Sequence, residues 1–200
     1  MRKARIAVLV SGGGTNLQAI LDAQARGEIP HGEVTLVISD RSGAYALERA
    51  KAAGVASLEI NKKACGGQAP FEEKLIAALE ENRTDVIVLA GFLSILTEKF
   101  TSKYPRRILN VHPSLIPSFC GAGFYGLKVH EAALARGVKV TGATVHFVNE
   151  IPDGGEIIAQ KAVEIREGDT PEVLQRRVME QAEWVILPQS VEKVCAGIVC

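Results

Sequence analysis

The chain has 200 residues, of which 47% are hydrophobic, and its 23 Lys and Arg residues balance 23 Asp and Glu residues. This length suits one large α/β domain with a sizeable core and is too short for two comfortable ones. A formal net charge of zero argues against a nucleic-acid binder that relies on an overall positive field. We therefore expect a single domain over residues 1–200 that does not bind nucleic acid.

No targeting or membrane segment is evident. The apolar run 6–10 is five residues long and ends at glycines, which is too short for a signal peptide or a membrane span. The four cysteines (Cys65, Cys120, Cys195 and Cys200) form no C-x-x-C pair, and the four histidines are scattered, so zinc spacing is absent. We expect a cytoplasmic protein with reduced thiols, no metal and no membrane partner, while a Cys195–Cys200 disulfide remains an alternative.

Short apolar runs alternate with helical patterns in the first half of the chain. The patterns predict strands over 6–10, 33–39, 56–60, 85–90 and 108–111, with helices over 16–24, 45–53 and 71–82 between them. The run 85–90 (DVIVLA) is apolar at successive positions, as a central parallel strand should be. This alternation predicts an open, mostly parallel, twisted sheet covered by helices, of the Rossmann-like kind.

The pattern changes after residue 140. Segments 143–148 and 157–163 alternate between apolar and polar residues, and a short segment containing Pro152, Asp153 and Gly154 joins them. We interpret them as a hairpin that extends the sheet in antiparallel fashion. A helix is expected over 170–184, with Thr170 as its N-cap and Pro171 in its first turn.

A glycine-rich turn, Ser11-Gly12-Gly13-Gly14-Thr15-Asn16, follows the first predicted strand and leads directly into a helix. Glycines let an anion approach the backbone N–H groups, and the helix adds its N-terminal partial positive charge. Because Leu17 stands where a G-x-G-x-x-G motif has its third glycine, a monophosphate is favoured over a dinucleotide. The alternative is a tight strand-to-helix turn without a ligand.

Asn110 and His112 are two residues apart at the end of the last predicted parallel strand, so they share one face of it. Ligands of open α/β sheets bind at this end of the strands. An amide and an imidazole together can polarise a carbonyl and stabilise the oxyanion that forms when an amine attacks it. Asp153 is a candidate third partner that could orient the imidazolium, although sequence spacing does not bring it to His112 and Asp-Gly is also an ordinary turn signal.

Four stretches carry a family resemblance: SGGGTNLQAI at 11–20, VLAGFLSIL at 88–96, LNVHPSLIPSF at 109–119 and TVHFVNEIPDGGEII at 144–158. With these motifs the chain resembles the phosphoribosylglycinamide formyltransferases over nearly its whole length. The resemblance implies transfer of a formyl group from 10-formyltetrahydrofolate to the amine of glycinamide ribonucleotide, a step of purine biosynthesis. It also implies that Asn110, His112 and Asp153 are the catalytic trio.

The same resemblance assigns binding residues. For the ribonucleotide it implies Gly13, Gly14, Thr15, Asn16 and Glu183; for the folate it implies Phe92, Leu93, Ile95, Leu96, Arg107, Val148, Glu150 and Ile151. Arg107 could instead pair with a carboxylate that has a structural role. His146 alternates within its predicted strand and could therefore face the site. The resemblance divides the domain into a phosphate-binding half, 1–110, and a folate-binding, catalytic half, 111–200. Both substrates are small molecules, no metal is implied, and the protein is expected to be a monomer or a homodimer.

The chain also departs from the family pattern. A basic residue common in the AGF-x-x-IL run is Ser94 here, an arginine is replaced by Gln68, and a histidine by Lys128. The segment 118–129 is longer than usual, and its glycines would permit it to move.

Four other functions fit the sequence less well. A hydrolase of formyltetrahydrofolate would carry an additional N-terminal domain, and a formyltransferase acting on initiator tRNA would carry a basic C-terminal one. A regulatory nucleotide-binding module gives no reason for the Asn110, His112 and Asp153 set. A dinucleotide-dependent dehydrogenase is disfavoured by the missing third glycine, although Asp40 lies near the position of its acidic ribose contact.

Overall fold

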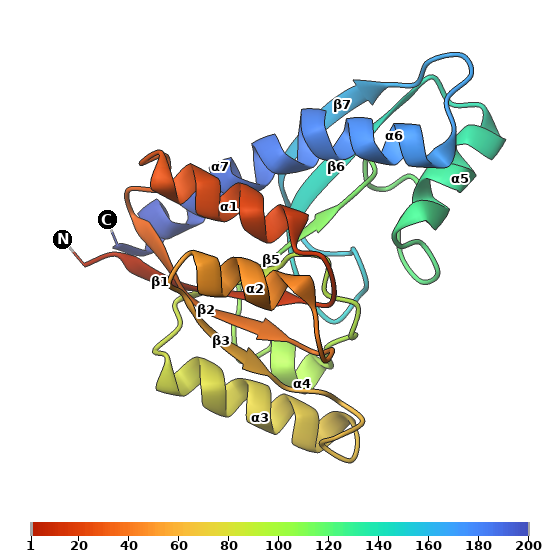
Figure 1. Ribbon diagram of the computed structural model, residues 1–200. Coiled ribbons are helices and arrows are strands. Elements are labelled where there is room, and N and C mark those ends of the chain that lie inside the picture. The colour runs from red at the N-terminus through yellow and green to blue at the C-terminus, as the bar shows by residue number, and fades with distance from the viewer. Residues whose placement is uncertain (1, 200) are drawn as a thin grey trace.

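The computed structural model describes residues 2–199. Within them, seven strands form one sheet in the order β3-β2-β1-β4-β5-β6-β7 (Figure 1). The strands are β1 (Ala4–Val10), β2 (Gly32–Ser39), β3 (Ala56–Glu59), β4 (Val86–Leu89), β5 (Ile108–His112), β6 (Val140–Phe147) and β7 (Ile157–Glu164). Neighbouring strands from β3 to β5 pair in parallel, whereas β6 and β7 pair antiparallel to their predecessors. The predicted fold class, a mostly parallel α/β sheet with an antiparallel extension, is confirmed.

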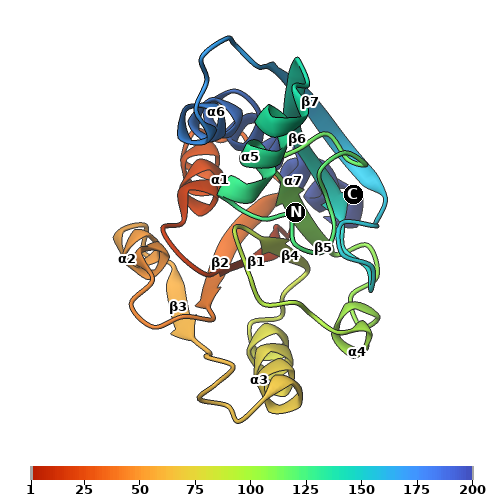
Figure 2. The ribbon, with the colours of Figure 1, turned by 90° about the vertical axis from the view of Figure 1, so that its right-hand side faces the viewer.

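Helices cover both faces of the sheet (Figures 1 and 2). On one face lie α1 (Thr15–Ala25), α2 (Tyr45–Ala52), α6 (Pro171–Val178) and α7 (Trp184–Val199); on the other lie α3 (Gln68–Glu81) and the short α4 (Glu98–Thr101). The remaining helix, α5 (Leu127–Arg136), lies beside α6. None of the helices in residues 2–199 has the length and apolar composition needed to cross a bilayer.

The core consists of two apolar layers, one on each side of the sheet. In β1 the side chains of Ile6 and Val8 enter the layer beneath α1 and α7, while Ala7 and Leu9 enter the layer above α3. All four are fully buried. Because both faces of β1 are covered, successive residues are apolar, as in other central parallel strands.

The order of the strands reverses between β1 and β4. The chain runs outward from β1 to β2 and β3, and it then returns to place β4 on the other side of β1. Such a switch point opens a crevice at the carboxyl ends of the two central strands, where open α/β sheets bind ligands. The Ser11 hydroxyl after β1 accepts a hydrogen bond from the Leu93 N–H after β4 at 2.8 Å, which joins the two loops at this crevice.

The ends of several helices differ from expectation. Helix α3 begins at Gln68, three residues earlier than predicted, because a proline such as Pro70 is tolerated in a first turn. The predicted Thr170 N-cap is confirmed, since its Oγ1 accepts a hydrogen bond from the Val173 N–H at 3.3 Å. However, the C-terminal helix does not stop at Trp184: a π-helical turn (Met179–Glu183) follows α6, and α7 continues through Pro188. Helices α4 and α5 were not predicted.

Candidate active site

The glycine-rich turn joins β1 to α1 in a conformation that requires glycine at one position. Gly14 is the N-cap of α1 with φ +73°, in the left-handed region. A Cβ atom at Gly14 would lie 2.6 Å from the Cβ of Ala46 on α2, which is a steric clash. The turn can therefore pass close beneath α2 only because Gly14 has no side chain.

The start of α1 is available to an anion. No side chain in the described part of the chain caps this helix, so its first backbone N–H groups keep no partner within the helix. The carbonyl groups of Gly12 and Gly13 accept hydrogen bonds from the Ala46 N–H and the Arg49 Nε–H, at 3.1 and 2.7 Å. These bonds hold the turn against α2 and leave a helix N-terminus that suits a phosphate.

Asn16 and Glu183 meet at this end of α1. The Asn16 Nδ2 donates to the Glu183 carboxylate at 2.8 Å, although the two residues are 167 positions apart. Glu183 is the last residue of the π-helical turn and is only 6% exposed. Burial raises the pKa of Glu183 from 4.5 to about 7, against the opposing effect of the Asn16 hydrogen bond. The structure thus brings two of the predicted ribonucleotide residues into direct contact.

Asn110, His112 and Asp153 lie together at the carboxyl end of β5. The strand presents Asn110 and His112 on one face, and the loop between β6 and β7 returns Asp153 to them. The Asp153 Oδ2 is 3.5 Å from the His112 Nδ1, and its Oδ1 is 3.5 Å from the Asn110 Nδ2. The fold therefore supplies the proximity that sequence spacing could not.

Both ring nitrogens of His112 have partners. The Nε2 donates to the Phe119 carbonyl at 2.8 Å, since a carbonyl oxygen can only accept, and the Nδ1 faces Asp153. His112 is 4% exposed and does not line the groove described below. Phe119 has φ +50°, which is unfavourable for a bulky side chain, so the segment after the prolines carries backbone strain where it contacts His112.

His146 completes the cluster from β6, where it pairs directly opposite Asn110. Its Nδ1 donates to the Phe147 carbonyl at 2.8 Å, and its Nε2 lies 3.2 Å from the Asn110 Nδ2 and 3.5 Å from the Asp153 Oδ1. The alternating pattern of this strand was the one sequence signal that His146 could face the site. The structure gives it contacts with two of the three predicted catalytic residues.

The Asp153 carboxylate is partly buried and accepts hydrogen bonds from its neighbours. Burial would raise its pKa, but hydrogen bonds from His146 and the Gly121 N–H, together with the charges of His112 and His146, hold the pKa below its ordinary value. The Gly121 N–H donates to the Asp153 Oδ2 at 2.8 Å. Asp153 therefore stays ionised and can balance a positive charge on a neighbouring imidazole.

A groove of about 140 Å³ leads away from this cluster. Asn110, His146 and Asp153 line one end of it. Seven of the eight predicted folate residues also line it: Phe92, Leu93, Ile95, Leu96, Val148, Glu150 and Ile151. Leu93 and Ile151 are largely exposed along it, so the groove is an apolar surface that a flat ring could cover.

Arg107, the eighth predicted folate residue, is not in the groove. It precedes β5 and therefore lies at the amino end of the strand, whereas the groove lies at the carboxyl end. Burial would raise the pKa of Asp85, just before β4, but hydrogen bonds from Arg2 and the Arg5 N–H, with a smaller contribution from the charge of Arg107, hold the pKa below its ordinary value. Arg107 thus lies where it could interact with a structural carboxylate, which is the alternative to folate binding.

The arrangement suits acid–base and oxyanion chemistry at a carbonyl. An amide, two imidazoles and an ionised carboxylate can stabilise developing negative charge and move protons within a few ångströms. Among residues 2–199 no group of three or more His, Cys, Asp or Glu side chains is arranged to hold a metal ion.

Comparison with known proteins finds relatives that match nearly the whole chain. A family model described as formyl transferase matches residues 4–191. The chain is 43% identical to the trifunctional purine biosynthetic protein adenosine-3 of Bos taurus over 198 residues, which is 99% of this chain and 19% of that protein. It thus spans 19% of the length of this first relative. It is also 41% identical to the phosphoribosylglycinamide formyltransferase of Haemophilus influenzae, with 92% of this chain and 84% of that protein covered.

Solved structures agree with the sequence comparison. Glycinamide ribonucleotide transformylase 1 from Symbiobacterium toebii superposes with a TM-score of 0.91 at 44% identity, over 98% of this chain and 89% of that one. Phosphoribosylglycinamide formyltransferase from Brucella melitensis gives a TM-score of 0.88 at 38% identity, over 100% and 99% of the two chains. The chain therefore belongs to the formyl transferase family and, within it, to the phosphoribosylglycinamide formyltransferases.

Proposed function

We propose that this protein transfers the formyl group of 10-formyltetrahydrofolate to the amine of glycinamide ribonucleotide, giving formylglycinamide ribonucleotide for purine biosynthesis. The observation that carries the proposal is the cluster of Asn110, His146 and Asp153 that lines the groove, with the His112 Nδ1 3.5 Å from the same carboxylate. The names of relatives that match nearly the whole chain support the choice of acceptor.

In this proposal the two substrates approach from different sides. The ribonucleotide phosphate binds Gly13, Gly14, Thr15 and Asn16 at the uncapped start of α1, and Glu183 contacts the rest of the acceptor near Asn16. The folate ring binds in the groove between the segment after β4 and the segment after β6. The acceptor amine and the formyl carbon then meet at Asn110.

The reaction begins when the neutral amine of the acceptor attacks the formyl carbon. The carbonyl oxygen becomes an oxyanion, and the Asn110 amide and the charged His112 imidazole donate hydrogen bonds to it. Asp153 keeps the imidazole charged. A proton moves from the attacking nitrogen to the leaving folate nitrogen through Asp153 or a water that it holds, and the bond from the formyl carbon to that nitrogen breaks.

One contact has to change before His112 can act in this way. Its Nε2 donates to the Phe119 carbonyl, so the formyl oxygen must replace that carbonyl as the acceptor. The exchange is local, because Phe119 lies in a segment whose glycines Gly121 and Gly123 already adopt φ +85° and +92°. Relief of the strained Phe119 backbone favours the exchange.

We further propose that the protein works in the cytoplasm as a monomer or homodimer. Among residues 2–199, Cys65, Cys120 and Cys195 form no disulfide with one another, which supports a reducing compartment. The alternative Cys195–Cys200 disulfide involves a residue outside the described part of the chain.

Release of tetrahydrofolate tests the proposal most directly. Absorbance is followed after mixing the protein with the 10-formyl donor, with and without glycinamide ribonucleotide. Release that requires the acceptor is the expected result. Release without the acceptor would indicate a hydrolase, and no release under either condition would contradict the proposed reaction.

A further inference from the structure

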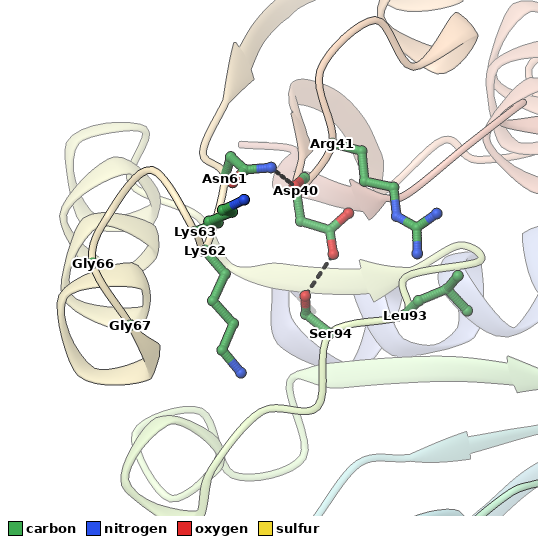
Figure 3. Close-up of a pocket in the computed structure, with 9 residues that line it drawn as sticks. All are labelled: Asp40, Arg41, Asn61, Lys62, Lys63, Gly66, Gly67, Leu93 and Ser94. Carbon is green, nitrogen blue, oxygen red and sulfur yellow. Dashed lines mark hydrogen bonds between the residues drawn. The ribbon is translucent and has the colours of Figure 1, made fainter.

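The carboxyl edge of the sheet differs on the two sides of the groove. Toward β2 lies a pocket of about 560 Å³, where the Ser94 hydroxyl donates to the Asp40 carboxylate (Figure 3). Toward β6 and β7 the segment 114–118, which follows β5, is held by two side chains. They are Thr144 of β6 and Gln160 of β7.

Thr144 stands between the catalytic strand and the edge strand of the sheet. It is paired with His112 of β5 on one side and with Gln160 of β7 on the other. Its side chain is fully buried. A side chain without exposed surface does not meet a substrate, so Thr144 can act on the reaction only through its neighbours.

The Thr144 hydroxyl uses its whole hydrogen-bonding capacity. It donates to the Ser114 carbonyl at 2.7 Å, and it accepts from the Ile116 N–H at 3.1 Å and from the Gln160 Nε2 at 2.9 Å. A hydroxyl offers one donor and two acceptor sites, and all three are occupied here. One side chain thus fixes both ends of the stretch 114–116.

Gln160 holds the same stretch from the next strand. Its Nε2 carries two N–H groups, one for the Thr144 hydroxyl and one for the Ile116 carbonyl, which lies at 3.0 Å. The next residue, Pro117, has no N–H of its own to donate. The two side chains together therefore bind both backbone groups of Ile116.

The backbone groups that contact the catalytic residues follow directly. The Ser118 carbonyl accepts from a serine hydroxyl within the held stretch, at 2.5 Å. The Phe119 carbonyl then accepts from the His112 Nε2, and the Gly121 N–H donates to the Asp153 Oδ2, both at 2.8 Å. The positions of these two groups thus depend on the path of the segment 114–118.

We propose that Thr144 and Gln160 are positioning residues for formyl transfer: they fix the segment 114–118, and through it the Phe119 carbonyl that orients His112. The inference rests on the proposed function and adds two residues to it. A misplacement of about 1 Å in a catalytic arrangement can cost roughly 10²-fold in rate. Neither residue lines the folate groove, so the effect falls on kcat rather than on KM.

Replacement of Thr144 is the first test. Thr144→Val keeps the shape of the side chain but removes all three hydrogen bonds, so we expect kcat to fall roughly ten- to hundredfold with the KM for both substrates close to that of the wild type. Thr144→Ser can make the same three bonds and should restore kcat. Thr141→Val is the matched control, because the buried Thr141 hydroxyl on the same strand has no hydrogen-bond partner within residues 2–199.

Replacement of Gln160 tests the same contact from an exposed position, where the core does not have to accommodate the change. In Gln160→Leu the Thr144 hydroxyl keeps its bonds to Ser114 and Ile116. We therefore expect a fall in kcat that is smaller than in Thr144→Val, again without a change in KM. The melting temperature of each variant shows that the fold is intact.

The thiol of Cys120 reports the position of the segment without turnover. Its Sγ donates to the Pro117 carbonyl at 3.3 Å, and burial, together with the charge of Asp153, raises its pKa. Release of the segment should therefore make Cys120 react faster with iodoacetamide, as measured by mass spectrometry of its peptide. We expect several-fold faster labelling of Cys120 in both variants and unchanged labelling of Cys65.

The two readouts separate this inference from the proposed function. If the wild type transfers no formyl group and Cys120 labels faster in the variants, the proposed reaction is wrong and the hold on the segment stands. Wild-type kcat in Thr144→Val would overturn the positioning role, and so would a fall in kcat with Cys120 labelling unchanged. A fall in kcat that Thr144→Ser does not reverse would also overturn it.

Discussion

Asn110 on β5 and His146 on β6 are cross-strand partners in an antiparallel pair, with the Asn110 Nδ2 3.2 Å from the His146 Nε2. The His146 Nδ1 donates to the Phe147 carbonyl, which turns the Nε2 toward the Asn110 amide and the Asp153 carboxylate. The register of the two strands thus fixes the orientation of the amide, because a slip of one residue would turn His146 to the opposite face.

Replacement of His146 should lower turnover without removing it. In His146→Ala the Asn110 amide loses a hydrogen-bond partner worth about 1–3 kcal/mol, so we expect kcat to fall by roughly tenfold or more. His146→Gln, which offers a carbonyl acceptor, should retain more activity. His31→Ala removes a histidine that pairs with Glu192 far from the groove and is the control. A kcat for His146→Ala equal to that of this control would contradict the orienting role.

Replacement of His112 should lower turnover more than replacement of His146 does. His112→Ala loses a donor to the oxyanion and the cation that faces Asp153, so turnover should fall by at least about 10²–10³-fold. Far-UV circular dichroism and the melting curve of the variant should show that the fold is intact. Turnover like that of the wild type in a folded variant would exclude the proposed mechanism.

Gly121 offers a test of the backbone support for Asp153. Gly121 and Gly123 both have φ near +90°, and a Cβ atom at either would meet nothing within 4 Å, but only the Gly121 N–H donates to the Asp153 Oδ2. Alanine should strain each position by about 1 kcal/mol. We expect Gly121→Ala to lower kcat several-fold more than Gly123→Ala at a similar melting temperature. Equal kcat values would show that strain in the backbone at Gly121 does not alter the position of Asp153.

Local patterns were enough to predict most of the sheet. Strands β1, β2, β4 and β5 each contain a short apolar run, and a signal of this kind depends only on neighbouring residues. The ends of the helices were harder to predict from the sequence, because they depend on contacts between distant segments. Pro188 lacks the N–H that a helix interior needs and usually ends or kinks a helix, so the continuation of α7 through it was not expected.

In the site, too, local sequence patterns predicted some features, whereas contacts between distant segments could not be predicted. The two-residue spacing placed Asn110 and His112 on one face. Asp153 was a candidate from its turn motif, but only the family resemblance grouped it with His112, because a loop 41 residues away had to return it. The Phe119 carbonyl and the Gly121 N–H were missed because backbone groups leave no signature in residue type. The sequence left two roles open for Arg107, because adjacency to the catalytic strand in sequence does not say which end of the strand a side chain occupies.

Glu183 should make stability depend on pH between 4.5 and about 7. Burial raises its pKa above the ordinary value of 4.5 to about 7 in the folded protein. Below pH 4.5 the carboxyl is neutral in both states, and its contribution to stability is fully present. As the pH rises, the unfolded chain ionises first, so this contribution falls and is lost once the pH passes about 7.

The free energy of unfolding that Glu183 contributes, and that is lost over this pH range, is about 3 kcal/mol, at roughly 1.4 kcal/mol for each pKa unit. Glu183→Gln cannot ionise, so its free energy of unfolding should lack this decrease, and the wild type should become progressively less stable than the variant across this range. Urea unfolding of both proteins at several pH values measures the difference. Glu172→Gln changes an exposed carboxylate in the first turn of α6 and should leave the pH dependence as it is in the wild type. Parallel pH curves for Glu183→Gln and the wild type would mean that Glu183 ionises in the folded protein as it does in the unfolded chain, despite its burial against Asn16.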